Sequence, residues 1–105
     1  MSEQGVPTTD IHSIPESIPA DLVVLDVREL HEWNAGHING AIHIPMSELP
    51  VRVGELDPSV RTVVVCHMGG RSARVTSWLH AQGHDVANLA GGMEMWEAAG
   101  RTVVA

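Results

Sequence analysis

The sequence has one cysteine and no lysine, phenylalanine or tyrosine among its 105 residues. A single cysteine cannot form an internal disulfide, which excludes a thioredoxin-type dithiol cycle and agrees with a reducing compartment. All of the aromatic area comes from three tryptophans, Trp33, Trp78 and Trp96. We therefore expect a largely aliphatic core, with these tryptophans packed in the core and at its rim.

Positive charge is also scarce. The six basic residues are arginines scattered along a chain whose formal net charge is -7, whereas nucleic-acid binding requires clustered positive charge. No apolar run is long enough to cross a bilayer, and the first ten residues lack the positively charged and then apolar layout of a signal peptide. We expect a cytoplasmic protein that binds neither nucleic acid nor membranes.

The length and composition are typical of one small globular unit. Hydrophobic residues make up 44% of the chain and charged residues 18%, which argues against a disordered protein. No repeat, low-complexity segment or linker divides the sequence. We expect one domain over residues 1–105, and a monomer is the favoured state.

Three runs of β-branched and apolar residues are typical of strands buried on both faces of a sheet. They lie at 22–27, 62–66 and 85–90. Helical patterns alternate with them, at 28–36, 46–56, 71–83 and 92–100. This alternation indicates an α/β fold with a mainly parallel sheet, to which residues 5–9 and 102–105 are expected to add edge strands.

The segment at 71–83 has the clearest helical pattern. An i, i+3, i+4, i+7 spacing predicts an apolar stripe with one polar end, formed by Val75, Trp78, Leu79 and Gln82. Gly83 and Gly100 stand where helices commonly end in a left-handed residue. Ser47 is a candidate N-cap for the helix at 46–56.

The cysteine lies at the carboxyl end of the second buried strand, directly before this helix. Ligands bind at that edge of open parallel sheets. Gly69 and Gly70 let successive backbone N–H groups point inward, and the helix adds the positive end of its dipole. A lone cysteine is more often a buried apolar residue, but these glycines and Arg71, whose donors suit an oxyanion or a charged sulfur, favour an activated thiol at Cys66.

The spacing of the loop narrows its chemistry. Four residues separate Cys66 from Arg71, and a ring this short suits one extra atom on the sulfur better than a tetrahedral phosphate. We predict that Cys66 attacks a donor, holds the transferred sulfur as a persulfide and releases it to a second nucleophile. A phosphatase or an arsenate reductase is the less favoured enzyme class.

Three blocks of the sequence, in the right order, resemble the rhodanese homology family. They are LDVRELHEWNAGHINGAIHIP at 25–45, CHMGGRS at 66–72 and LAGGMEMWEAAG at 89–100. The resemblance implies a three-layer α/β fold with a mainly parallel five-stranded sheet flanked by helices. It also implies thiosulfate:cyanide sulfurtransferase activity without a cofactor, with Cys66 as the nucleophile. The implied substrate-binding loop consists of His67, Met68, Gly69, Gly70 and Arg71, with Ser72 opening the helix.

The resemblance leaves the donor and the acceptor open. Family members that use thiosulfate tend to carry a basic residue just after the cysteine, where this chain has His67 and Met68. The acceptor is expected to be cyanide or a thiol. The alternative is a sulfur-carrier or partner-binding module that another protein loads. Phosphatases and arsenate reductases of similar fold have a loop one residue longer.

The remaining polar candidates are expected to be structural. Asp26 and Arg28 are expected to tie adjacent loops together, and His37 to bond the local backbone. His80 and His84 are four residues apart, but the glycine between them should end the helix, so no metal site is expected.

A second glycine pair follows the third predicted strand. Gly91 and Gly92 are expected to make a tight turn beside the cysteine loop, where a close approach requires small residues. The neighbouring Met93 and Met95 are either helix contacts or an exposed apolar lip for a partner.

Overall fold

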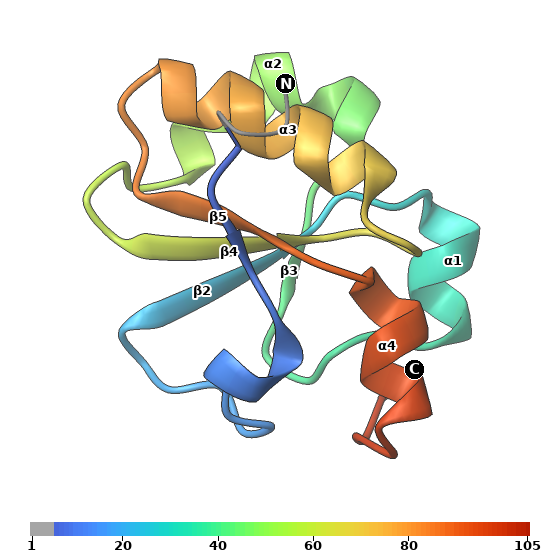
Figure 1. The fold of residues 1–105 in the computed structure, drawn as a ribbon. Coiled ribbons are helices and arrows are strands. Elements are labelled where there is room, and N and C mark those ends of the chain that lie inside the picture. The colour runs from blue at the N-terminus through green and yellow to red at the C-terminus, as the bar shows by residue number, and fades with distance from the viewer. Residues whose placement is uncertain (1–5) are drawn as a thin grey trace.

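Within residues 6–105, the part of the chain that the computed structural model describes, five strands form one wholly parallel sheet (Figure 1). In chain order the strands are β1 (Thr8–Thr9), β2 (Leu22–Asp26), β3 (Ile42–His43), β4 (Arg61–Val65) and β5 (Val86–Leu89). Their order across the sheet is β1-β5-β4-β2-β3, which puts β4 at the centre. The predicted α/β fold with a five-stranded parallel sheet is confirmed.

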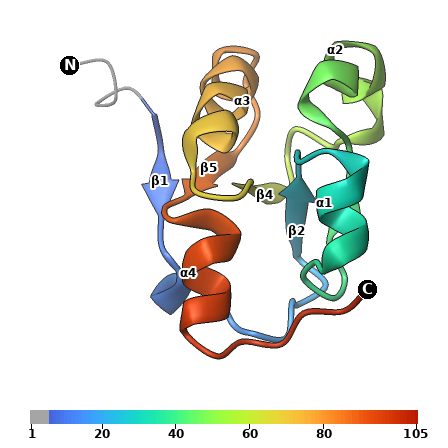
Figure 2. The same cartoon turned by 90° about the vertical axis from the view of Figure 1, so that its right-hand side faces the viewer.

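Helices cover both faces of this sheet and complete three layers (Figure 2). In the described part of the chain, residues 6–105, the α-helices are α1 (Leu30–Ala35), α2 (Leu49–Arg52), α3 (Gly70–Ala81) and α4 (Gly92–Ala98). Within the same residues three 3-10 turns accompany them, η2 (Ile11–Ser13), η3 (Met46–Glu48) and η4 (Val53–Glu55). Helices α2 and α3 lie on one face, α4 and η2 lie on the other, and α1 lies beside the end of β2.

The two faces of β4 pack in two different apolar clusters, which explains the continuous run of valines in this strand. Successive side chains of a strand point to opposite faces, so Val64 packs in the cluster beneath α2 and α3. Val63 and Val65 belong to the cluster that contains Trp96 of α4. Trp96 is fully buried, whereas Trp33 is half-buried and Trp78 is exposed, so the expected mixture of core and rim packing is confirmed.

The apolar stripe predicted for α3 was partly wrong. The side chains buried against the sheet are Ser72, Val75, Thr76 and Leu79. Gln82 is exposed, and Trp78 is 39% exposed because it lines a shallow apolar groove between α2 and α3. Two small polar side chains therefore occupy the inner face of α3, where the periodicity alone favoured a tryptophan.

The residues predicted to end helices agree with the structure, whereas the predicted N-cap does not. Gly83 and Gly100 follow their helices with φ of 93° and 78°, the left-handed conformation that was expected. Ser47 does not cap the segment at 46–56, because the chain there begins with the 3-10 turn η3, whose N-cap is Pro45. The single helix predicted over that segment is two 3-10 turns flanking one turn of α-helix.

One edge of the sheet differs from the prediction. Residues 102–105 form no strand of the sheet, because Val104 makes only an isolated antiparallel bridge to His37. The outer strand is instead β3, which was not predicted because a strand of two residues shows no periodicity in the sequence. At the opposite edge β1 pairs with β5, as expected for residues 5–9, of which Gly5 lies outside the described residues.

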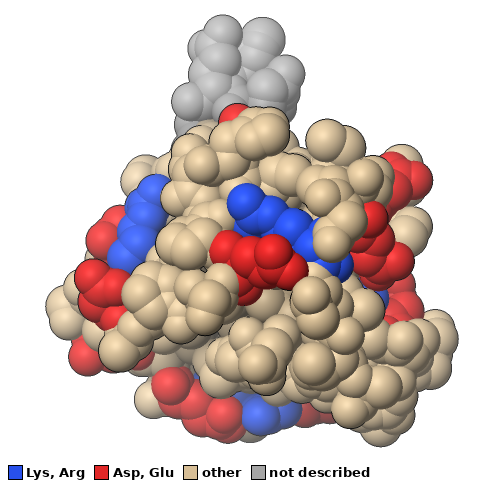
Figure 3. Space-filling view, turned by 90° about the horizontal axis from the view of Figure 1, so that it is seen from below, with Lys and Arg blue, Asp and Glu red and all other residues tan. Residues whose placement is uncertain are grey.

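Surface charge follows the scattered arginines of the sequence. On the face shown in Figure 3, basic side chains are interspersed with acidic ones and form no continuous positive area. Within residues 6–105, no helix combines the length and the apolar character that crossing a membrane requires.

Candidate active site

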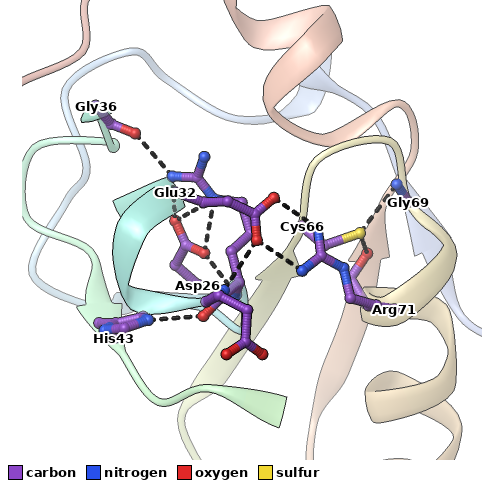
Figure 4. Close-up of polar contacts among 10 residues, drawn as sticks. Asp26, Glu32, Gly36, His43, Cys66, Gly69 and Arg71 are labelled. Carbon is purple, nitrogen blue, oxygen red and sulfur yellow. Dashed lines mark hydrogen bonds and ion pairs between the residues drawn. The ribbon is translucent and has the colours of Figure 1, made fainter. Parts of the chain in front are cut away.

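Cys66 follows β4 directly, at the carboxyl edge of the sheet (Figure 4). Its side chain is only 1% exposed. The sulfur accepts a hydrogen bond from the Gly69 N–H, with N and Sγ 3.0 Å apart, and Sγ lies 3.2 Å from the Ser72 hydroxyl oxygen. The loop therefore wraps around the sulfur as predicted, but of its two glycines Gly69 alone has a positive φ, and a Cβ on Gly70 would meet open space.

These contacts change the acidity of the thiol. Burial raises the pKa of Cys66, because it disfavours the charged thiolate. The hydroxyl of Ser72 and the backbone N–H groups of Ser72, Gly69 and Arg71 outweigh burial, and the net effect lowers the pKa below its ordinary value. A thiolate is the nucleophilic form of cysteine, so the loop favours the reactive state.

The shape of the loop depends on two glycines in the left-handed region. Gly69 is the N-cap of α3, with φ of 113°. Gly92 has φ of 53°, and a Cβ placed on it would collide with the carbonyl oxygen of Cys66 and lie 2.8 Å from that of His67. This confirms the tight turn predicted for Gly91 and Gly92.

Backbone hydrogen bonds from helix α4 hold the cysteine loop in place. The N–H groups of Met93 and Glu94, in its first turn, donate to the carbonyl oxygens of Cys66 and His67 over 2.8 and 2.9 Å. Met93 is buried in the core, whereas Met95 is 47% exposed. The question left open by the sequence is thus settled for Met93, which is a helix contact.

Arg71 is bound by an acidic residue that was not among the predicted site residues. Its two terminal nitrogens donate to the two carboxylate oxygens of Glu32 over 2.8 and 2.9 Å (Figure 4). The hydrogen bonds from Arg71 lower the pKa of Glu32 to about 2. The guanidinium expected to receive an anion therefore already holds a carboxylate, which joins the active loop to α1.

Ser72 does more than begin a helix, because α3 already starts at Gly70. Its buried hydroxyl lies between the Cys66 sulfur and the side-chain oxygen of Asn88 on β5, 2.5 Å from the latter. Asn88 was also missed. The sequence contained one signal for it: Asn88 is an amide in a strand whose other residues, Val86, Ala87 and Leu89, are apolar.

The other predicted loop residues form the outer rim. His67, Met68 and Gly70 are exposed, and Met68 is 62% exposed. Of the seven predicted residues, from Cys66 to Ser72, Gly69 and Ser72 donate hydrogen bonds to the sulfur. Which of them touch a substrate stays a prediction.

Two structural expectations near the site are confirmed. The buried Arg28 donates to both carboxylate oxygens of Asp26 and to the Gly36 carbonyl oxygen, and so ties β2 to the end of α1. His37 bonds the Trp33 carbonyl over 2.9 Å and stacks on the Trp33 ring. Among the described residues, no group of three or more His, Cys, Asp or Glu side chains is arranged to hold a metal ion.

The fold and this loop define a class of protein. Residues 11–99 match the family of rhodanese-like domains, which is most of the chain, and the protein belongs to that family. The crystal structure of a rhodanese-related protein from Thermoplasma volcanium agrees, with a TM-score of 0.87 and 33% identity. That similarity covers 93% of this chain and 97% of the other.

Three relatives have sulfur chemistry in their names. Bacillus subtilis YtwF, named as a sulfurtransferase, is 39% identical over 81% of this chain and 84% of its own length. The thiosulfate sulfurtransferase GlpE of Pseudomonas putida is 36% identical over 72% of this chain and 70% of GlpE. Bacillus subtilis YrkF, named as a sulfur carrier, is 33% identical over 88% of this chain, which spans about half of YrkF (51%).

Proposed function

We propose that this protein is a sulfurtransferase in which Cys66 carries the transferred sulfur as a persulfide. One observation carries the proposal: the Cys66 sulfur lies at the end of β4 within reach of the Gly69 N–H and the Ser72 hydroxyl, with its pKa lowered. The names of the relatives YtwF and GlpE support the same chemistry.

The reaction consists of two displacements at sulfur. With thiosulfate as donor, the Cys66 thiolate attacks the outer sulfur atom, the sulfur–sulfur bond of thiosulfate breaks, and sulfite leaves with the electron pair. Cyanide then attacks the outer sulfur of the persulfide, the new sulfur–sulfur bond breaks, and thiocyanate leaves as the Cys66 thiolate is regenerated. A thiol acceptor would take the sulfur in the same way.

The loop supplies what a persulfide anion needs. Donors already point at the Cys66 sulfur, and the first turn of α3 adds further N–H groups. Fixed dipoles of this kind stabilise an anion without reorganising when it forms. The exposed His67 and Met68 at the rim are where a donor would first contact the protein.

A sulfur-carrier role is the second candidate, and the Arg71–Glu32 pair favours it. Because Glu32 neutralises Arg71 and the four residues before Arg71 carry no permanent charge, little attracts free thiosulfate, which is a dianion. A partner protein would then load Cys66. The sulfur-carrier name of YrkF is consistent with this role.

Steady-state formation of thiocyanate from thiosulfate and cyanide tests the proposal. A sulfurtransferase gives a saturable rate with ping-pong kinetics that Cys66→Ser abolishes, whereas the control variant Ser77→Ala, exposed on α3, keeps the wild-type rate. A carrier gains sulfur from a protein persulfide but turns over thiosulfate poorly. Hydrolysis of an aryl phosphate that Cys66→Ser abolishes would instead support a phosphatase, which the four-residue spacing disfavours.

A further inference from the structure

Asn88 is an unusual residue for its position. It lies on β5, which pairs with the central strand β4, and it is 7% exposed. Its side chain reaches Ser72 on α3, whose side chain is fully buried. A buried amide is stable only where its hydrogen bonds are satisfied, and within residues 6–105 Ser72 is the hydrogen-bond partner of the Asn88 side chain.

The Ser72 hydroxyl has one proton and two neighbours that can accept it. Its oxygen is 2.5 Å from Oδ1 of Asn88 and 3.2 Å from Sγ of Cys66. While Cys66 is a thiol, both contacts are satisfied: the S–H donates to the hydroxyl oxygen, and the O–H donates to Oδ1. Once Cys66 is a thiolate, the O–H must donate to sulfur, and Oδ1 loses its donor.

Rotation of the Asn88 side chain can restore a hydrogen bond to Ser72 without any movement of the backbone. Its amide carries an acceptor at one end and a donor at the other. A half-turn of the amide presents Nδ2–H to the hydroxyl oxygen, which gives a chain of donors from Nδ2 through Oγ to the thiolate. Successive hydrogen bonds in such a chain strengthen one another.

Accordingly, we propose that Asn88 is a positioning residue for Cys66. Its amide presents oxygen to Ser72 while Cys66 is a thiol and nitrogen while Cys66 carries a negative charge. The Ser72 hydroxyl is thereby satisfied in both states. The inference rests on Cys66 being the nucleophile of the proposed function, but it concerns ionisation of the sulfur and can be tested without any sulfur transfer.

Asparagine is the residue type that this role requires. Aspartate has the same shape but offers only acceptors, so it holds the Ser72 proton in the orientation that suits the thiol. Asn88→Asp therefore raises the apparent pKa of Cys66 in two ways, through its charge and through Ser72. The second contribution disappears when Ser72 is replaced by alanine.

The test is a double-mutant cycle on the ionisation of Cys66, followed by thiolate absorbance against pH. Asn88→Asp is measured with Ser72 present and in the Ser72→Ala background, with the exposed Asn39→Asp as control for the added charge. We expect the shift caused by Asn88→Asp to be larger by about one pH unit, or tenfold in thiolate at a given pH, when Ser72 is present. An equal shift in both backgrounds would show that only charge acts and would overturn the proposal.

A second measurement leaves Asn88 itself unchanged. The side-chain amide of Asn88 is followed by ¹H–¹⁵N nuclear magnetic resonance across the titration of Cys66. We expect its signals to move with the Cys66 midpoint, and to lose that movement in Ser72→Ala. Asn88 signals that do not move as Cys66 titrates would overturn the proposal. A coupled titration in a protein that transfers no sulfur would overturn the proposed function alone.

Discussion

Arg71 and Glu32, 39 residues apart in the sequence, are joined by two parallel hydrogen bonds of 2.8 and 2.9 Å. The same carboxylate accepts the Glu29 N–H at the start of α1 over 2.9 Å. Glu32 therefore holds the active loop and the first turn of α1 together, which makes it a test point for both stability and loop geometry.

Replacing Glu32 by glutamine is expected to destabilise the fold in a pH-dependent way. At pH 7, Glu32→Gln should lower the free energy of unfolding by about 1 kcal/mol, since one bidentate, half-buried ion pair is lost. The pKa of Glu32 is lowered to about 2 in the folded protein, so the stability that it contributes is full above its ordinary pKa and is lost as the pH falls toward 2. Urea unfolding at several pH values should show the two proteins converging in acid, and a constant difference would contradict this account.

Ionisation of Cys66 provides the second prediction. Because contacts from the Ser72 side chain and the loop N–H groups lower the pKa of Cys66, the thiolate should form at a lower pH than in an unstructured peptide. Ser72→Ala removes the side-chain donor and should move the midpoint upward, while Ser72→Thr, which keeps the hydroxyl, should not. Thiolate absorbance measures each midpoint. A Ser72→Ala midpoint equal to that of the wild type would show that the hydroxyl has no effect.

Gly92 provides a third prediction, with a matched control in the same chain. Gly92→Ala puts a Cβ against the Cys66 carbonyl oxygen at a positive φ, and should lower the free energy of unfolding by about 3 kcal/mol and abolish sulfur transfer. Gly54→Ala adds the same methyl group where no atom lies within 4 Å and φ is ordinary. It should change stability by less than about 1 kcal/mol. Similar unfolding curves for the two variants would mean that the turn is not constrained.

A fourth prediction separates structure from chemistry at the buried Asp26–Arg28 pair. Asp26→Asn leaves the Arg28 guanidinium, 5% exposed, without its counter-charge, and should lower the free energy of unfolding by about 3 kcal/mol. The ionisation midpoint of Cys66 should stay the same in the folded variant. A midpoint that moved by a unit or more would give Asp26 a part in the chemistry.

Local sequence patterns were enough to predict the path of the chain through the site. The apolar run of β4, the cysteine after it, the glycines of the loop and the helix that follows are adjacent in sequence. Their order therefore determined where Cys66 lies and which residues surround it. Gly92 was also predictable, because two adjacent glycines after a buried strand indicate a sharp turn.

Contacts between distant segments were not predictable. Glu32 meets Arg71 because α1 lies beside the carboxyl edge of the sheet, and Ser72 meets Asn88 because α3 packs across β5. Neither packing has a local signal. For the same reason periodicity misplaced Trp78, whose exposure depends on the groove that α2 forms with α3.

The central claim is that Cys66 holds a transferable sulfur atom. The most direct test is the intact mass of the protein after brief incubation with thiosulfate or with a persulfide donor, before and after cyanide, for the wild type and Cys66→Ser. Our account predicts that only the wild type gains one sulfur atom and that cyanide removes it. A wild-type protein that gains no sulfur from either donor, or a Cys66→Ser variant that gains as much, would contradict it.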